Sequence, residues 1–154
     1  MANKNFDFQS LKVKLAERGL KVTSQRLVIF QCLLKYNEHP SAEMIFERIK
    51  DDHPSISLAT VYKTLDTLVE AGLAKKIESW DALKRFDAKT EQHTHLFCIN
   101  TNEIIDFEDA ELSGLLEEYF KRKEFKNFTV TDFQLQINGQ IGDKSKSIKL
   151  KQLK

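Results

Sequence analysis

In the first half of the chain, apolar residues recur every three or four positions, which is the spacing of amphipathic helices. The pattern predicts helices over about residues 11–20, 24–34, 41–49 and 57–71. Three hydroxyl side chains stand at or just before the starts of such segments and are suitable helix N-caps: Thr23, Ser41 and Ser57. Gly72 follows the last segment, where glycine commonly ends a helix. This half is therefore predicted to be mainly helical.

The segment that ends at Gly72 has two faces of different character. One face is apolar at helical spacing and should be buried, with Leu58, Val61, Leu65 and Leu68. The opposite face has small, hydroxyl-bearing and aromatic side chains with one lysine: Ala59, Thr60, Tyr62, Lys63, Thr64 and Thr67. A plain solvated face more often alternates Glu and Lys, whereas this set suits contacts with phosphates and base edges of DNA.

Two short strand-like segments, 73–78 and 84–87, follow this helix. Helices followed by a two-stranded hairpin are in the order of a winged helix-turn-helix, which is a DNA-binding architecture. A generic small helical domain is the alternative that the pattern leaves open.

From residue 89 onward the pattern favours β-structure. Strands are predicted over 95–99 and 103–107, a helix over 108–123 and an alternating strand over 128–138. The result is a small α+β lobe, so the whole chain is predicted to be of the α+β class. Because such a lobe buries little surface by itself, we expect a sheet edge or the apolar helix face to pair with a second copy.

Composition narrows the classes of partner. The chain has 154 residues with 24 basic and 23 acidic side chains, so its net charge of +1 gives no general signal for nucleic acid or for acidic membranes. No signal peptide or membrane span is evident, and a cytoplasmic protein without membrane partners is expected. Cys32 and Cys98 are the only cysteines, and they imply no disulfide framework.

A His-x-His motif, His93 and His95, lies in an apolar strand-like run, and Asp106 follows on the predicted neighbouring strand. Alternate residues of a strand share a face, so two imidazoles and a carboxylate could meet there. His39 and Asp87 complete a plausible shell for a divalent metal ion. Spacing by itself supports only the His-x-His pair, and ordinary half-exposed strand histidines remain the alternative.

Several blocks of the sequence, in their order along the chain, resemble the ferric uptake regulator (Fur) family across about residues 11–138. The block 57–65, with Gly72 after it, resembles the family's recognition-helix signature. The others are 22–26, 39–43, 85–87, 93–95 and 104–107.

The resemblance implies a winged-helix DNA-binding domain over 1–86, a hinge over 87–92 and an α+β dimerisation and metal-sensing domain over 93–154. It implies one regulatory divalent ion per subunit, Fe(II) or Mn(II), with Zn(II) possible in purified protein. The implied metal ligands are His39, Asp87, His93, His95 and Asp106. The implied DNA contacts are Lys21, Ser57, Thr60, Tyr62 and Lys63. On this basis we expect a homodimeric repressor that binds operator DNA and is not an enzyme.

Asp106 resembles the peroxide-response branch of the family, since glutamate is usual at this place in the iron-uptake regulators. That branch implies oxidation of a histidine ligand by peroxide and Fe(II), with His39 and His93 as the candidates. Three alternatives remain: an iron- or manganese-responsive repressor without peroxide chemistry, a winged-helix dimer that senses no metal, and a non-haem metalloenzyme using His93, His95 and Asp106.

The chain departs from the family at a second site, where members commonly hold a structural zinc with two Cys-x-x-Cys pairs. Thr101 stands where the partner of Cys98 would be, and residues 139–144 contain no cysteine. A structural zinc held by four cysteines is therefore expected to be absent. A further imidazole-rich site of some members is also expected to be lost, with other residues at its ligand positions: Gln92, Thr94 and Phe133.

Overall fold

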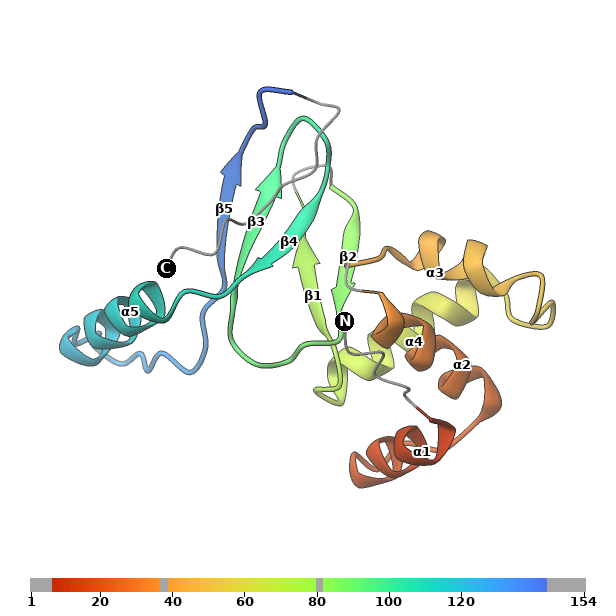
Figure 1. The fold of residues 1–154 in the computed structure, drawn as a ribbon. Coiled ribbons are helices and arrows are strands. Elements are labelled where there is room, and N and C mark those ends of the chain that lie inside the picture. The colour runs from red at the N-terminus through yellow and green to blue at the C-terminus, as the bar shows by residue number, and fades with distance from the viewer. Residues whose placement is uncertain (1–6, 37–38, 80–81, 144–154) are drawn as a thin grey trace. The chain divides into compact units, whose positions relative to one another are not determined.

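The computed structural model describes residues 7–36, 39–79 and 82–143 (Figure 1). The chain divides into two compact units, Met1–Thr90 and Glu91–Lys154. The boundary after Thr90 falls inside residues 87–92, the hinge that the family resemblance implies. None of the helices in the described ranges is both long and apolar enough to cross a lipid bilayer.

The helices of the first unit are α1 (Phe8–Glu17), α2 (Ser24–Lys35), α3 (Ala42–Ile49) and α4 (Leu58–Glu70). Each begins after a short polar residue whose side chain accepts a hydrogen bond from a backbone N–H in the first turn, and these caps are Asp7, Thr23, Ser41 and Ser57. The three caps predicted from the sequence are thus confirmed. Helix α1 ends before Leu20, because Gly19 adopts a φ of 70° that stops the helix.

A hairpin completes the first unit. Gly72 adopts a φ of 70° and its N–H donates to the Val69 carbonyl, which ends α4 at the predicted place. Strands β1 (Lys75–Glu78) and β2 (Lys84–Asp87) then pair antiparallel. The order of helices and hairpin is that of a winged helix-turn-helix.

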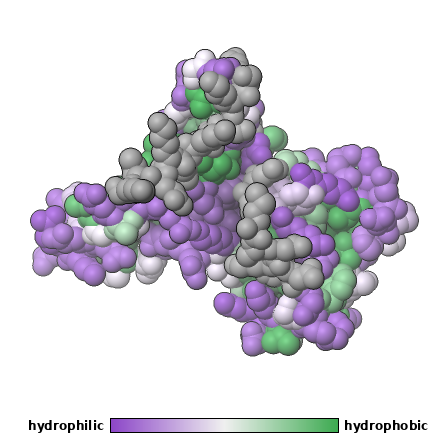
Figure 2. Space-filling model, in the orientation of Figure 1, coloured by the Kyte–Doolittle hydropathy of each residue, from purple (hydrophilic) through white to green (hydrophobic). Residues whose placement is uncertain are grey.

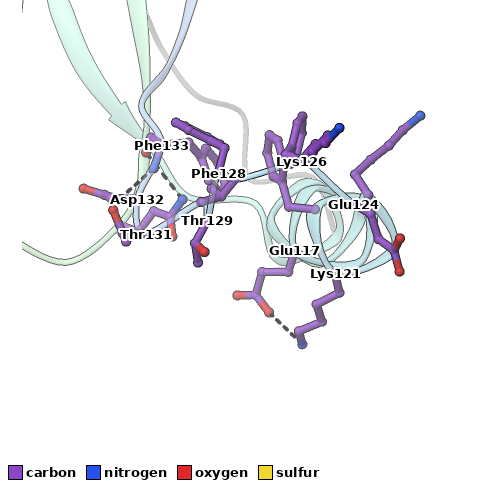
Figure 3. A pocket seen from close by; sticks show the side chains of 14 residues that line it. Glu117, Lys121, Glu124, Lys126, Phe128, Thr129, Thr131, Asp132 and Phe133 are labelled. Carbon is purple, nitrogen blue, oxygen red and sulfur yellow. Dashed lines mark hydrogen bonds and ion pairs between the residues drawn. The ribbon is translucent and has the colours of Figure 1, made fainter.

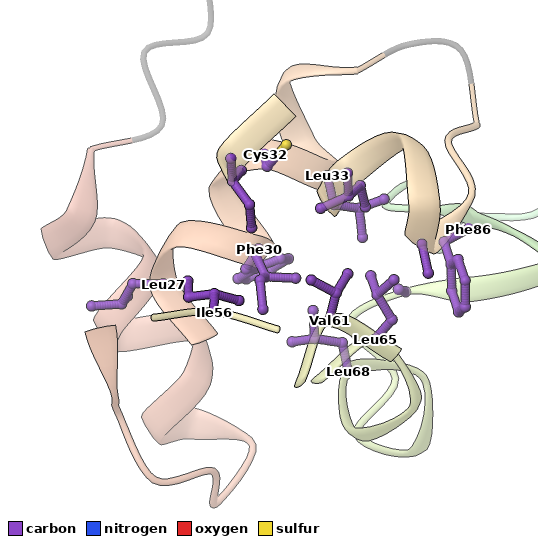
Figure 4. Close-up of a cluster of buried hydrophobic side chains, with 14 of the residues drawn as sticks. Leu27, Phe30, Cys32, Leu33, Ile56, Val61, Leu65, Leu68 and Phe86 are labelled. Atoms are coloured by element: carbon purple, nitrogen blue, oxygen red, sulfur yellow. The ribbon is translucent and has the colours of Figure 1, made fainter. Parts of the chain in front are cut away.

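The apolar faces of α1 to α4 and the inward side of β2 form one core (Figure 4). Phe30 of α2, Leu65 of α4 and Phe86 of β2 are among its fully buried side chains. Thr64 is only 6% exposed, so its predicted place on the outward face of α4 is wrong. It follows Val61 by three residues and precedes Leu68 by four, so it lies within the buried stripe and not opposite it.

The second unit contains β3 (Thr94–Cys98), β4 (Ile104–Phe107), α5 (Ala110–Arg122) and β5 (Leu135–Gly139). Strand β3 lies between the other two, antiparallel to β4 and parallel to β5. The predicted strand 128–138 is wrong in its first half. Leu135 pairs with Thr94, the first residue of β3, so the residues before Leu135 have no length of β3 left to pair with.

Helix α5 carries the predicted apolar stripe, yet none of its residues is buried. Leu115 is 59% exposed and Tyr119 is 46% exposed. Figure 2 shows hydrophobic patches among the hydrophilic residues on this part of the surface. The second unit therefore presents an apolar helix face to its surroundings.

Replacing Leu65 by Ala should lower the free energy of unfolding by about 2–5 kcal/mol, because a fully buried leucine is lost from a packed core. Val13→Ala is the matched control: this side chain lies on α1 and is 55% exposed, so the change should be at most about 0.5 kcal/mol. Urea unfolding followed by the helical circular-dichroism signal measures both. Equal small changes would contradict this assignment of the core.

Candidate functional site

Two of the predicted metal ligands, His39 and Asp87, meet in the first unit. His39 Nε2 lies 3.7 Å from Asp87 Oδ2, and both side chains are buried. The other carboxylate oxygen of Asp87, Oδ1, accepts the backbone N–H of Lys89 at 2.7 Å, which fixes the rotation of the carboxylate and turns Oδ2 toward the imidazole. A separation of 3.7 Å is too long for a hydrogen bond. It is compatible with two ligands of one cation.

The backbone around His39 is unusual. His39 has a φ of 48°, in the left-handed region that non-glycine residues rarely adopt, and it directly precedes Pro40. The neighbouring chain is held to the hairpin, because the Pro40 carbonyl accepts the N–H of Phe86 at 3.0 Å and Ser41 forms a β-bridge with Arg85. Such a conformation persists only where its surroundings enforce it, and it is frequent at functional sites.

The remaining predicted ligands, His93, His95 and Asp106, meet in the second unit. His95 lies directly opposite Asp106 across the antiparallel pair of β3 and β4, and His93 immediately precedes β3. Asp106 Oδ1 lies 3.0 Å from His93 Nε2 and 3.7 Å from His95 Nε2. The two imidazole rings have their centroids 4.4 Å apart. Three potential ligand atoms therefore converge on one small volume.

The hydrogen bonding of His93 indicates what that volume can hold. His93 Nδ1 lies 2.9 Å from the carbonyl oxygen of Glu91, which can only accept, so Nδ1 carries the proton. Nε2 of the neutral ring is then an acceptor, and it faces another acceptor, Asp106 Oδ1. Two lone pairs at this distance repel each other unless a proton or a metal cation lies between them. A backbone carbonyl on the far nitrogen is also the usual support of a metal-binding histidine.

The donor set fits a divalent transition-metal ion. Metal–ligand bonds of about 2.0–2.2 Å place neighbouring ligands roughly 3.0–3.5 Å apart. The separations of 3.0 and 3.7 Å around Asp106 Oδ1 are close to that range. Nitrogen and oxygen ligands without sulfur suit Fe(II) and Mn(II), and they also accept Zn(II), Co(II) or Ni(II).

Each predicted ligand thus has another beside it: His39 with Asp87, and His93 with His95 and Asp106. Sequence reasoning missed the groups that orient them, the N–H of Lys89 and the carbonyl of Glu91. Both are backbone groups, so no side-chain pattern could have marked them.

The predicted DNA-contacting residues lie on the first unit. Ser57 caps α4, and its hydroxyl also lies 2.9 Å from the hydroxyl of Thr60. Lys63 is exposed one turn further on, and Lys21 is exposed before α2. The carbonyl of Lys21 accepts a hydrogen bond from the Arg26 guanidinium, which ties the start of α2 to the preceding turn.

Tyr62 on α4 has a partner that the sequence did not reveal. Its hydroxyl donates to the carboxylate of Glu43 in the first turn of α3. This hydrogen bond lowers the pKa of Glu43 and raises the pKa of Tyr62. The two residues are nineteen positions apart, so only the packing of α3 against α4 brings them together.

Comparison with known proteins gives these arrangements a context. The model of the ferric uptake regulator family matches residues 17–138. The peroxide-responsive repressor PerR of Staphylococcus aureus (strain Mu50 / ATCC 700699) is 30% identical over 125 residues, which are 81% of this chain and 82% of the relative.

Solved structures agree in fold. The peroxide stress regulator of Campylobacter jejuni is 31% identical, with a TM-score of 0.66 over 88% of this chain and 96% of its own. The ferric uptake regulator of Pseudomonas aeruginosa, solved with manganese, is 29% identical, with a TM-score of 0.73 over 86% of this chain and 98% of its own.

The chain therefore belongs to the ferric uptake regulator family. It is a metal-responsive transcription regulator, similar to the peroxide-response branch, and it is not an enzyme. The predicted resemblance and the predicted fold, a winged helix-turn-helix followed by a small α+β domain, are confirmed. Membership also decides against the metalloenzyme alternative.

Replacing His95 by Ala should weaken Mn(II) binding by at least about 100-fold, because one of the converging nitrogens is lost, whereas His53→Ala should change it by no more than about twofold. His53 is the matched control, since it is the chain's one histidine outside both clusters. Calorimetric titration of Mn(II) into the metal-free protein measures both affinities. An unchanged affinity in the His95 variant would remove this residue from the ligand set.

Proposed function

We propose that this protein is a metal-dependent repressor that binds operator DNA as a homodimer when each subunit holds one regulatory divalent ion. The observation that carries the proposal is the convergence of His93, His95 and Asp106, with the His93 tautomer set by the Glu91 carbonyl. As a DNA-bound regulator the protein would act in the cytoplasm.

One ion, in this proposal, has five protein ligands: His39, Asp87, His93, His95 and Asp106. An ion bound by the two ligands of the first unit alone, or by the three of the second unit alone, would have at least three of six coordination positions without a protein ligand. An ion bound by all five would have only one such position. Sharing it ties the DNA-binding unit to the second unit. Metal and DNA then favour the same arrangement of the chain, and each raises the affinity for the other.

Helix α4 is the proposed recognition helix. Tyr62 and Lys63 would reach bases and phosphates in the major groove, while Ser57 and Thr60 at the helix start and Lys21 would contact the backbone. The exposure of these residues supports the assignment. Ser57 caps α4 and Lys63 lies on it, both are exposed, and the opposite face of the helix packs in the core. Since the chain's net charge is only +1, such local contacts must supply the attraction for DNA.

The second unit is the proposed dimerisation domain. A groove of about 820 Å³ lies between α5 and the segment before β5, and four phenylalanines line it: Phe120, Phe125, Phe128 and Phe133. Figure 3 shows Phe128 and Phe133 on the loop side of the groove and the Glu117–Lys121 ion pair on α5. A second copy would cover these phenylalanines and set the two recognition helices at the spacing of successive major grooves, about 34–36 Å.

The dimer is proposed to form without a structural zinc of the four-cysteine type, since the chain has only two cysteines. Asn100 instead joins the β3–β4 turn to the end of β5. Its amide nitrogen donates to the Ile141 carbonyl at 2.7 Å, its amide oxygen accepts the Ile141 N–H at 3.3 Å, and the Cys98 thiol donates to the same oxygen. These bonds connect the two chain segments that a zinc would otherwise hold together.

The regulatory ion is proposed to be Fe(II) or Mn(II), with Zn(II) able to occupy the site in purified protein. The manganese in the P. aeruginosa relative supports this range of metals. Asp106, together with the similarity to peroxide-responsive relatives, favours peroxide sensing over simple metal response. When bound, Fe(II) would activate peroxide through iron redox chemistry. In net terms, one peroxide oxygen would enter a ring C–H bond of His39 or His93, the ring would give up the two electrons that reduce the peroxide, and the other oxygen would leave as water.

The metal requirement can be tested on DNA directly. Mn(II) should raise the affinity for the protein's own promoter region by about 5- to 150-fold over the metal-free protein, the usual range of such coupling. His39→Ala and His95→Ala, changes in separate units, should each abolish this gain, while His53→Ala should keep it. Mobility-shift titrations measure the affinities. Equal binding by metal-free and Mn(II)-loaded protein would argue for a winged-helix dimer that senses no metal.

Peroxide sensing needs its own experiment. Exposure of the Fe(II) form to hydrogen peroxide should add one oxygen atom, located on His39 or His93 by peptide mass analysis, and should release the DNA. The Mn(II) form is the control and should gain none, because hydrogen peroxide does not readily oxidise Mn(II) and the bound ion would therefore not activate it. An Fe(II) form that stays unmodified and DNA-bound would favour the iron- or manganese-responsive alternative.

A further inference from the structure

A side-chain hydrogen bond from Tyr62 to Glu43 joins the proposed recognition helix to the helix before it. The Tyr62 ring packs at the edge of the core, and its hydroxyl reaches the Glu43 carboxylate at the surface of the first unit. Ring and hydroxyl are therefore held at two points. These two contacts limit the orientations in which Tyr62 could meet a base.

The direction of this hydrogen bond is set by its surroundings. The Tyr62 hydroxyl, the backbone N–H of Glu43 and the Ser41 hydroxyl all stabilise the carboxylate, and together they lower the pKa of Glu43. The same bond raises the pKa of Tyr62. Glu43 therefore remains an ionised acceptor and Tyr62 a protonated donor throughout the neutral range of pH.

An anion at this place is unfavourable for DNA binding in itself. Phosphates dominate the attraction of proteins to DNA, and a carboxylate beside the recognition helix opposes that attraction. Capping of α3 does not require Glu43, since the Ser41 hydroxyl already accepts the first-turn N–H of Met44. The contact with Tyr62 is the interaction that connects this side chain to another helix.

We propose that Glu43 is a specificity-determining positioning residue, which holds the Tyr62 phenol in the orientation that reads the operator and itself makes no favourable contact with DNA. The inference rests on the proposed function, because it presumes that α4 enters the major groove. A pre-oriented tyrosine binds the correct sequence without losing further rotamer freedom, and it cannot swing to accommodate a wrong one. Glu43 accordingly lowers the affinity for DNA in general and raises the preference for the operator over other sequences.

The test separates the charge of Glu43 from its hydrogen bond. The Mn(II)-loaded wild type first selects its operator from a random duplex pool. Fluorescence anisotropy then gives the affinity for that duplex and for a scrambled duplex of equal composition, and the ratio of the two is the readout. The variants are Glu43→Gln, Glu43→Ala, Tyr62→Phe and the Glu43→Ala/Tyr62→Phe double variant.

Glu47→Gln is the matched control, because it makes the same charge change on the same helix at a residue paired with Lys50 and not with Tyr62. Its ratio should equal that of the wild type.

Glu43→Ala should lower the ratio about tenfold, since one hydrogen bond to a charged group no longer fixes the tyrosine, while binding to the scrambled duplex tightens. Glu43→Gln, whose amide oxygen still accepts, should keep the ratio within about threefold of the wild type. Tyr62→Phe should match Glu43→Ala, and the double variant should lose no more than about twofold beyond either one.

Two results would overturn the inference. In the first, Tyr62→Phe lowers the ratio and Glu43→Ala does not, so Tyr62 acts without its partner. In the second, Glu43→Ala weakens both duplexes equally and lowers the melting temperature, which is the result of a purely structural role. Failure of the wild type to select any duplex would instead refute the proposed function, and the inference with it.

Discussion

The proposed function depends on one physical constraint, the meeting of nitrogen and oxygen acceptor atoms that repel each other unless a proton or a cation lies between them. His93 donates from Nδ1 to the Glu91 carbonyl, so the lone pair on Nε2 faces an oxygen of Asp106 at 3.0 Å. His39 and Asp87 lie beside each other in the first unit, with the Asp87 carboxylate turned by the N–H of Lys89. Bringing such atoms together in buried surroundings costs free energy that the proposed divalent ion would return. Metal affinity and the folded arrangement of the ligands are therefore linked.

The rest of the fold holds those ligands in place. The register of β3 and β4 sets His95 opposite Asp106, and the bond from Phe86 to the Pro40 carbonyl holds the loop in which His39 adopts its left-handed conformation. The core includes Phe86, and Asp87 follows it on β2, so the packing of the first unit and the placement of a proposed metal ligand use the same strand. A backbone that is strained at His39 is sustained by these neighbours, and the strain is stored next to the position where regulation is proposed.

Because the chain is nearly neutral, its recognition of DNA depends more on the placement of individual side chains than on overall charge. Helix α4 buries Leu65 and Leu68, and its outer positions carry Tyr62 and Lys63. The Glu43–Tyr62 bond adds an acidic group at a surface proposed to meet phosphates, which is understandable if discrimination matters more than affinity. In the proposed function, an ion held by both units would remove part of the ordering cost of binding DNA, which would matter for a regulator with weak general attraction for DNA.

Much of the local structure of this protein follows from interactions between residues that are close in sequence. The caps Thr23, Ser41 and Ser57 and the stop at Gly72 act within one turn of the chain. The His-x-His spacing acts over three residues at the start of β3, so the sequence by itself determined these features. Tertiary structure decided what depends on a distant partner. Thr64 is buried because of how α4 meets the core, and residues before Leu135 are not in a strand because β3 offers them no partner. Likewise, the groups that orient the ligands are backbone atoms of Lys89 and Glu91, and the partner of Tyr62 lies on another helix. Hydrogen bonds between segments far apart in sequence leave no periodic signal along the chain, and for that physical reason only the folded structure could specify them.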